Sequence, residues 1–234
     1  MKRLMHLGLF VFLALLSTSG SKVSAQSYVN LLNDAELSHW MKPNGDPVHR
    51  SEDGTSGWRM EDGGILHLSG NGGNLLSREK YGDFDLWFEY RISEKGNNGI
   101  KYRVAQYNRD WLGLEYQIQD DAAFPNMSPK HLTASLYDIV AQSSPIFERD
   151  YRPLSEFNVG RIILQGNQIR HWQNGRLIID ECVGSSRWLK AVSESKFRDR
   201  EHFGQNQHGH LMLTDHNSET WFRNVFIRRL DKCP

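Results

Sequence analysis

The chain has 234 residues, of which 38% are hydrophobic, 24% are charged and 11% are aromatic. This length and composition are those of one sizeable globular domain, and they exclude a disordered chain, a fibrous repeat and a disulfide-dense miniprotein. The 28 Lys and Arg residues equal the 28 Asp and Glu residues in number. A neutral chain lacks the basic field that attracts nucleic acids and anionic membranes, so neither is expected as a partner.

The N-terminal residues 1–25 have the pattern of a secretory signal peptide. Lys2 and Arg3 precede an unbroken apolar run at residues 7–16, and a stretch of small residues ends at Ala25. The apolar run is too short to span a bilayer as a helix. We therefore expect cleavage after Ala25, and a periplasmic or secreted location with no membrane segment in the mature chain. An uncleaved membrane anchor is the alternative.

Alternating apolar and polar residues predict a succession of β-strands. Residues 85–92 and 99–104 both alternate and are separated by a turn signal, so we expect them to pair as a hairpin. Asn-Gly at residues 174–175 predicts a second hairpin. Further strands are expected at residues 65–68, 112–119, 133–139, 161–165, 168–172, 176–180, 210–214 and 221–229, and a short helix within residues 188–197.

About nine short strands joined by Gly-rich turns indicate an all-β sandwich or barrel. No Pro/Ser-rich linker and no internal repeat interrupts residues 26–234, so we expect a single domain there. Export permits disulfides, and two cysteines, Cys182 and Cys233, are available. They are expected either to be bridged or to remain free thiols, because a chain of this size folds without a disulfide.

Several predicted strands have a polar face that could bind a ligand. The first predicted hairpin carries aromatic and charged side chains of both signs on that face. These side chains are Trp87, Glu89, Arg91, Lys101 and Arg103. A solvated sheet face with cross-strand ion pairs is the plainer explanation of the same pattern.

A stripe of acid and amide side chains favours a carbohydrate ligand. Glu115, Gln117 and Gln119 fall on one face of a predicted strand, and Asp120 follows it. Carboxylates and amides exchange several hydrogen bonds with sugar hydroxyls. The Glu-x-Gln-x-x-Asp pattern resembles the Glu-x-Asp-x-x-Glu strand of retaining glucanases, which need two carboxylates about 5–5.5 Å apart. Because an amide replaces the middle acid, ordinary double-displacement hydrolysis is not expected.

A second candidate group follows the predicted strand at residues 210–214. Asp215 and His216 come directly after it, and Arg223 and Asn224 lie a few residues further on. A histidine titrates near neutrality and can serve as a general acid or base. A surface or structural role for His216 is the alternative.

The chain as a whole resembles the 3-keto-disaccharide hydrolase domain family, which has a concanavalin-like jelly-roll fold. The matching segments occur in order at residues 58–64, 75–84, 97–100, 115–120, 172–175, 214–216 and 222–225. Two positions depart from the family pattern, since Asn98 replaces the usual Ser and Thr214 replaces the usual Gln. The resemblance implies a jelly-roll β-sandwich of two antiparallel sheets.

The resemblance also implies an enzyme that cleaves the glycosidic bond of a sugar already oxidised at C3, a 3-keto-glycoside or 3-keto-disaccharide. The ketone acidifies the C2 proton, so a base can remove it, and the C1 substituent is then expelled. The net outcome is hydrolysis or a lyase elimination. A sugar 3-oxidase acting upstream would supply the substrate.

Catalytic roles under this hypothesis fall to Glu115 and His216 as base or acid, and to Lys101 as the cation that stabilises the enolate. Substrate binding is assigned to Gln117, Asp120, Arg223, Trp87 and Arg103, of which Arg223 is the alternative stabilising cation. A divalent metal could replace that cation, with Asp120, Asp215 and His216 as its candidate ligands.

Two other functions remain open from the sequence. The domain could bind carbohydrate without catalysis, or it could be an ordinary glycosidase that acts on unoxidised glycans. Residues 121–132 are a long segment between predicted strands, and residues 182–207 are an insertion. We expect sugar specificity to reside in them.

Overall fold

The computed structural model of the chain describes residues 26–34, 36–48, 57–142 and 152–231. The predicted signal peptide at residues 1–25 lies outside the described residues, as does Cys233. Cys182 is exposed and has no disulfide partner among the described residues. No helix within the described ranges is long and apolar enough to cross a membrane.

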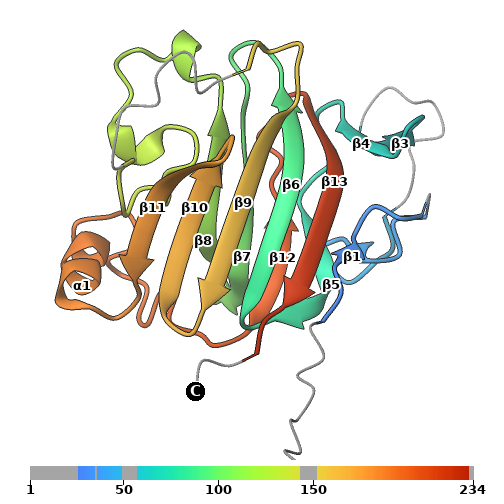
Figure 1. Cartoon of the computed structure of the whole chain (residues 1–234). Coiled ribbons are helices and arrows are strands. Elements are labelled where there is room, and N and C mark those ends of the chain that lie inside the picture. The colour runs from blue at the N-terminus through green and yellow to red at the C-terminus, as the bar shows by residue number, and fades with distance from the viewer. Residues whose placement is uncertain (1–25, 35, 49–56, 143–151, 232–234) are drawn as a thin grey trace, which may run out of the picture.

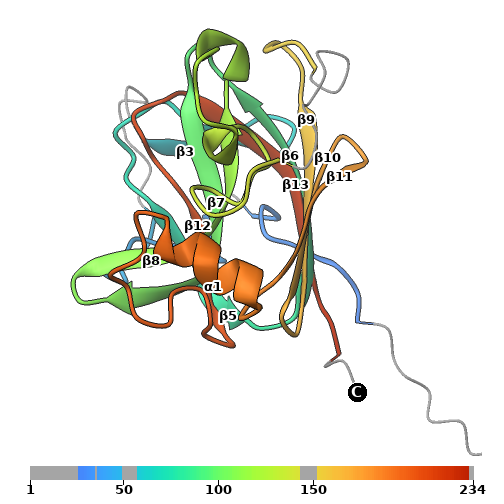
Figure 2. The ribbon, with the colours of Figure 1, turned by 90° about the vertical axis from the view of Figure 1, so that its left-hand side faces the viewer.

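Two antiparallel β-sheets packed face to face form the body of the molecule. The strands are β1 (Val29–Asn30), β2 (Trp40–Met41), β3 (Trp58–Glu61), β4 (Ile65–Leu68), β5 (Leu75–Tyr81), β6 (Phe84–Ile92), β7 (Asn97–Tyr107), β8 (Asp110–Gln119), β9 (Asn158–Gln165), β10 (Gln168–Gln173), β11 (Arg176–Cys182), β12 (Gly209–Leu213) and β13 (Thr220–Arg229). In the described part of the chain, the larger sheet has eight strands in the order β11-β10-β9-β6-β13-β4-β3, with β1 paired to β13. The smaller sheet has five, in the order β2-β5-β12-β7-β8. Figure 1 looks onto the larger sheet, and Figure 2 shows the two sheets as facing layers. The predicted jelly-roll β-sandwich is confirmed.

The core lies between the sheets and is rich in aromatic side chains. Phe88 of β6 is fully buried and meets Tyr116 of β8 across the interlayer space, edge to face, with ring centroids 5.2 Å apart. Such a pair contributes about 0.5–1.5 kcal/mol beyond the burial of its area. Along β6, Phe88 and the other even-numbered side chains point inward, and Trp87 and Glu89 lie on the outer face.

The predicted hairpin between residues 85–92 and 99–104 is wrong. The first run is β6 of the larger sheet, whereas the second is β7, which pairs with β8 and β12 in the smaller sheet. The turn that follows Ile92 carries the chain from one layer to the other, and the backbone N–H of Ser93 donates to Glu219 O at 3.0 Å. Each run needs to bury one apolar face, and facing sheets satisfy that need as well as a hairpin does.

Residues 133–139 form an irregular segment along β8 and not the predicted strand. Three backbone hydrogen bonds join it to β8, from Ala134 N to Gln117 O at 2.8 Å, from Tyr137 N to Glu115 O at 3.0 Å and from Gln117 N to Ser135 O at 3.4 Å. Positive φ angles at Ala134 (64°) and Asp138 (62°) interrupt the extended conformation. The segment covers the edge of the smaller sheet that would otherwise be open, and it holds Tyr137 beside β8.

The helix α1 (Ser186–Ser193) overlaps the predicted helical segment and begins two residues earlier. The hydroxyl of Ser185 caps it by accepting from the backbone N–H of Trp188 at 3.1 Å. The side chain of Trp188 is fully buried, so it anchors the long insertion between β11 and β12 to the core. Figure 1 shows α1 beside β11, and the guanidinium of Arg187 in the helix donates to Asp180 O of that strand at 3.3 Å.

Candidate active site on the smaller sheet

A lysine and a glutamate stand opposite one another on β7 and β8. Lys101 and Glu115 are register partners, and Lys101 Nζ lies 3.8 Å from Glu115 Oε2. Both point away from the core, and Glu115 is only 5% exposed. Gly99 provides the space for this carboxylate, because a Cβ at that position would come within 2.4 Å of Glu115 Oε1. The tight approach explains why a glycine stands at this position of the strand.

The amides that follow Glu115 on the same face extend this polar stripe. Gln117 Nε2 donates to Asn97 Oδ1 at 2.9 Å. Gln119 is 3% exposed, and its Nε2 has no hydrogen-bond partner among the described residues. The stripe therefore contains one buried donor that is unpaired among the described residues.

Lys196, which the sequence did not single out, reaches the same face from the loop after α1. Its backbone N–H donates to Asp138 Oδ2 at 2.6 Å, which ties the loop to the segment along β8. Its Nζ lies 4.2 Å from the ring centroid of Tyr137. Burial lowers the pKa of Lys196, and the positive charge of Lys101 acts in the same direction, while Glu115 opposes it. Two ammonium groups therefore flank one carboxylate.

His216, in the loop after β12, is close enough to this cluster for the charges of Glu115, Lys101 and Lys196 to act on its pKa. Its side chain is solvent-exposed, yet protein atoms packed on its other sides partly desolvate the ring. This desolvation lowers the pKa of His216 below its ordinary value, Lys101 and Lys196 lower it further, and the charge of Glu115 opposes them. The structure thus brings Lys101, Glu115 and His216 together, with Lys196 added.

Two predicted carboxylates hold loops in place. Asp120 Oδ2 accepts from the backbone N–H of Lys95 at 2.8 Å. Asp215 Oδ2 accepts from the backbone N–H of Gly73 at 2.7 Å. Within the described ranges, no three His, Cys, Asp or Glu side chains form a group that could hold a metal ion. Asp120, Asp215 and His216 therefore do not form the predicted ligand set.

Arg103 does not share the face of Lys101. A β-bulge between Tyr102 and Ala105 gives Arg103 a φ of 49° and turns it away. Its guanidinium is buried, where it donates to Gly166 O at 2.5 Å and to Gly204 O at 3.5 Å. In this structure it holds two loops together.

Trp87 and Arg223 are separated from Glu115 by the whole sandwich. Both lie on the outer face of the larger sheet, where Arg223 Nε is 2.5 Å from Glu89 Oε2. The prediction of one polar face that combines Trp87, Glu89 and Arg91 with Lys101 is wrong, because β6 and β7 belong to different sheets.

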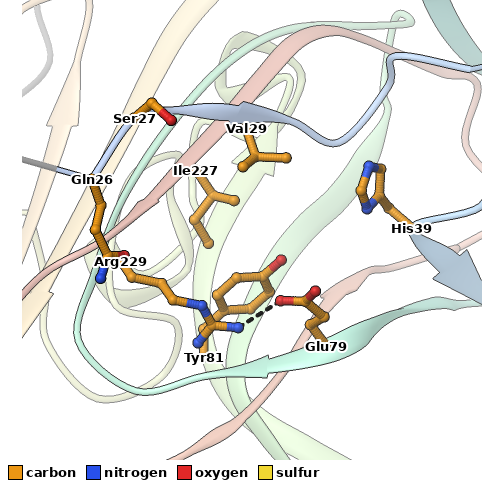
Figure 3. A pocket seen from close by; sticks show the side chains of 8 residues that line it. All are labelled: Gln26, Ser27, Val29, His39, Glu79, Tyr81, Ile227 and Arg229. Atoms are coloured by element: carbon orange, nitrogen blue, oxygen red, sulfur yellow. Dashed lines mark hydrogen bonds and ion pairs between the residues drawn. The ribbon is translucent and has the colours of Figure 1, made fainter.

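A pocket of about 440 Å³ lies elsewhere, at the end of β5 that is distant from His216 (Figure 3). Strands of both sheets contribute to it, and Arg229 pairs there with Glu79 at 2.6 Å. Its lining residues are Gln26, Ser27, Val29, His39, Glu79, Tyr81, Ile227 and Arg229. None of the predicted site residues lines this pocket.

The fold and this cluster define a jelly-roll protein with a candidate active site on the outer face of one sheet. The model of the 3-keto-alpha-glucoside-1,2-lyase-like domain matches residues 27–228, and the chain belongs to this family. The predicted family is thereby confirmed.

Three relatives illustrate the likeness. A Bacteroides thetaiotaomicron protein named 3-keto-disaccharide hydrolase is 26% identical over 243 residues, which covers 89% of this chain and 80% of the relative. A crystal structure from Parabacteroides distasonis, provisionally named a glycosyl hydrolase, has a TM-score of 0.74 at 23% identity and covers 87% of this chain and 94% of that one. The Bacillus licheniformis β-glucanase has a TM-score of 0.52 at 10% identity, and the match covers 90% of this chain and 100% of the glucanase. The two structural likenesses support the fold alone.

Proposed function

We propose that the protein cleaves the glycosidic bond of 3-keto-glycosides by removing the C2 proton and eliminating the C1 substituent. The observation that carries this proposal is a single carboxylate, Glu115, paired with Lys101 and electrostatically coupled to Lys196 and His216. Removal of the C2 proton leaves negative charge on the C3 oxygen, and preorganised cations are suited to stabilise such charge. The family and the name of the Bacteroides relative support the choice of substrate.

The proposed steps use the cluster as follows. Glu115 accepts the C2 proton, and the electron pair of the C2–H bond moves onto the C3 oxygen as an enolate beside Lys101 and Lys196. The ketone then re-forms, a C1–C2 double bond appears, and the C1–O bond breaks. His216 protonates the departing oxygen, and its lowered pKa makes the imidazolium a stronger acid. Water that adds across C1–C2 gives net hydrolysis, whereas release at this stage gives a lyase product.

The side chain next to Glu115 on this face supports elimination over double displacement. A retaining glycosidase needs a second carboxylate about 5–5.5 Å from the first. The neighbouring position on the same face of β8 is Gln117, whose amide cannot act as a nucleophile. This favours the keto-sugar reaction over ordinary hydrolysis of an unoxidised glycan.

The chemistry of the substrate implies an enzyme that supplies it. The reaction needs a sugar already oxidised at C3, so we propose a sugar 3-oxidase as the preceding enzyme. The signal-peptide pattern of residues 1–25 supports our proposal that the reaction takes place in the periplasm or outside the cell.

The test is a paired assay of the purified protein on a nitrophenyl 3-keto-glucoside and on the same glucoside without the ketone. We expect release of nitrophenol from the keto substrate only, and several-fold slower release when C2 carries deuterium. Glu115→Gln should lower kcat by about 10²–10⁴-fold, the usual contribution of a general base.

The matched control is Glu79→Gln, because Glu79 is an exposed carboxylate on the same sheet that pairs with Arg229 away from the cluster. This control should keep full activity. Equal release from the unoxidised glucoside would identify an ordinary glycosidase. Saturable sugar binding without turnover of either compound would identify a binding domain.

A further inference from the structure

The outer face of the larger sheet carries a row of side chains that the candidate active site does not use. Trp172 of β10 is the register partner of Arg161 in β9, Arg161 is opposite Trp87 in β6, and Trp87 is opposite Phe226 in β13. We call these four residues the aromatic row. All four are partly exposed. Their strands lie side by side in Figure 1, and the described helix does not cross in front of them.

The dimensions of the aromatic row suit an extended glycan. Neighbouring strands are about 4.8 Å apart, so the row spans about 14 Å, with its two tryptophans about 10 Å apart. That separation is comparable with the length of two sugar residues. The rings of Trp87 and Phe226 are tilted by 36° with centroids 6.5 Å apart, and the guanidinium of Arg161 lies 5.4 Å from the ring centroid of Trp172. The row therefore offers apolar ring platforms, with the guanidinium of Arg161 between its two tryptophans.

The charges beside the aromatic row are paired among themselves. Asp85 accepts from Arg161 Nε and Nη2 at 2.8 Å each, and from Arg228 Nη2 at 2.9 Å. On the other side of the row, Glu89 pairs with Arg223 at 2.5 Å. This pairing neutralises most of the charge beside the row, so a strongly charged partner is not favoured. A neutral ligand with flat apolar faces and many hydroxyl groups fits better.

We propose that the aromatic row is a second carbohydrate-binding surface, which holds an extended neutral glycan across β10, β9, β6 and β13. It lies on the sheet opposite Glu115, so the glycan is bound outside the candidate active site. This inference does not depend on the keto-sugar reaction. It also gives a role to Trp87, which the sequence analysis assigned to substrate binding.

The test is binding of the purified protein to three neutral glycans: insoluble cellulose, insoluble amylose and soluble mixed-linkage β-glucan. We expect binding to at least one of them, weakened by about tenfold or more in Trp172→Ala and in Trp87→Ala, as is usual when a Trp anchor is removed. Trp87→Phe, which keeps a ring, should retain most of the binding. Circular dichroism and thermal melting verify that each variant is folded.

The control is Trp111→Ala, which removes a partly exposed tryptophan from the smaller sheet. It should leave binding unchanged. Three results would overturn the proposal. The first is no binding to any of the three glycans. The second is binding that is lost in Trp111→Ala or Glu115→Gln but kept in Trp172→Ala and Trp87→Ala. The third is a dimer, seen in sedimentation, that Trp172→Ala dissociates.

Discussion

Lys196 reaches the candidate active site on a loop, whereas Lys101 and Glu115 stand on paired strands. The loop is nevertheless held, because the backbone N–H of Lys196 donates to Asp138 and its ammonium group lies over Tyr137. A cation positioned in this way stabilises a developing enolate without reorganisation during the reaction.

Replacing this lysine by methionine, Lys196→Met, keeps the side-chain length and removes the charge. We expect kcat on a 3-keto-glycoside to fall by about 10²–10³-fold, with a smaller change in KM, since the charge acts mainly on the enolate. Lys190→Met is the control, because Lys190 is an exposed α1 residue that pairs with Glu194 at 3.7 Å. A higher KM at unchanged kcat would show that Lys196 only binds the substrate.

At the scale of elements, β10 places the side chain of a histidine in the core. His171 is fully buried between Ala134 O, 3.0 Å from Nδ1, and the hydroxyl of Tyr102, 2.8 Å from Nε2. A carbonyl only accepts, so Nδ1 carries the proton and Nε2 accepts from Tyr102. Both contacts are satisfied by the neutral ring, and burial lowers the pKa of His171 from 6.5 to about 4.

This pKa makes the stability of the sandwich depend on pH. The unfolded chain binds a proton at His171 near pH 6.5, whereas the folded chain binds it only near pH 4. The free energy of unfolding is therefore highest above pH 6.5 and falls by roughly 3 kcal/mol as the pH drops to 4. Urea denaturation between pH 7 and 5, before most carboxylates titrate, measures how steeply the free energy of unfolding depends on pH. His171→Gln should flatten this dependence, and an unchanged slope would contradict this account.

Strands that bury one face could be predicted from the sequence. β4 matches its predicted bounds, Ile65–Leu68, and β6 begins one residue early, because alternation reports directly which side chains enter the core. Strands of two residues, such as β1 and β2, are too short to alternate and were missed. The pairing of β6 with β7 was mispredicted, because turn chemistry does not distinguish a hairpin from a crossing between layers.

The candidate site was predictable only where strands carry it. Lys101 and Glu115 belong to neighbouring segments of a recognisable pattern, whereas nothing in the sequence around Lys196 indicates that its loop folds onto β8. The two departures from the family pattern are likewise linked only in space, since Thr214 Oγ1 donates to Asn98 Oδ1 at 2.9 Å. Long-range contacts of this kind require the fold.

At the scale of the whole molecule, the sandwich keeps the candidate active site and its main buried ion-pair network on opposite sheets (Figure 2). The network centres on Asp85, which is 1% exposed and accepts from Arg161, from Arg228 and from the hydroxyl of Tyr28 at 2.6 Å. It joins β6, β9 and β13 to the residue that precedes β1. Burial acts to raise the pKa of Asp85, but the hydrogen bond from Arg161 and the other partners hold it below its usual value.

Stability and catalysis should therefore be separable by substitution. Asp85→Asn removes a buried charge but leaves its two arginines, which are 38% and 32% exposed and partly solvated. We expect the free energy of unfolding to fall by about 2–3 kcal/mol, which is less than the loss for a fully buried pair. The kcat/KM on a small keto-glycoside should stay unchanged. Asp180→Asn, which breaks an exposed pair with Arg170 in the same sheet, should lower the free energy of unfolding by less than about 1 kcal/mol.

Lys196→Met should show the opposite pattern, with kcat lost and the melting temperature retained. A large loss of turnover in a folded Asp85→Asn protein would mean that the two sheets are coupled, because packing would then transmit the change across the core to Glu115.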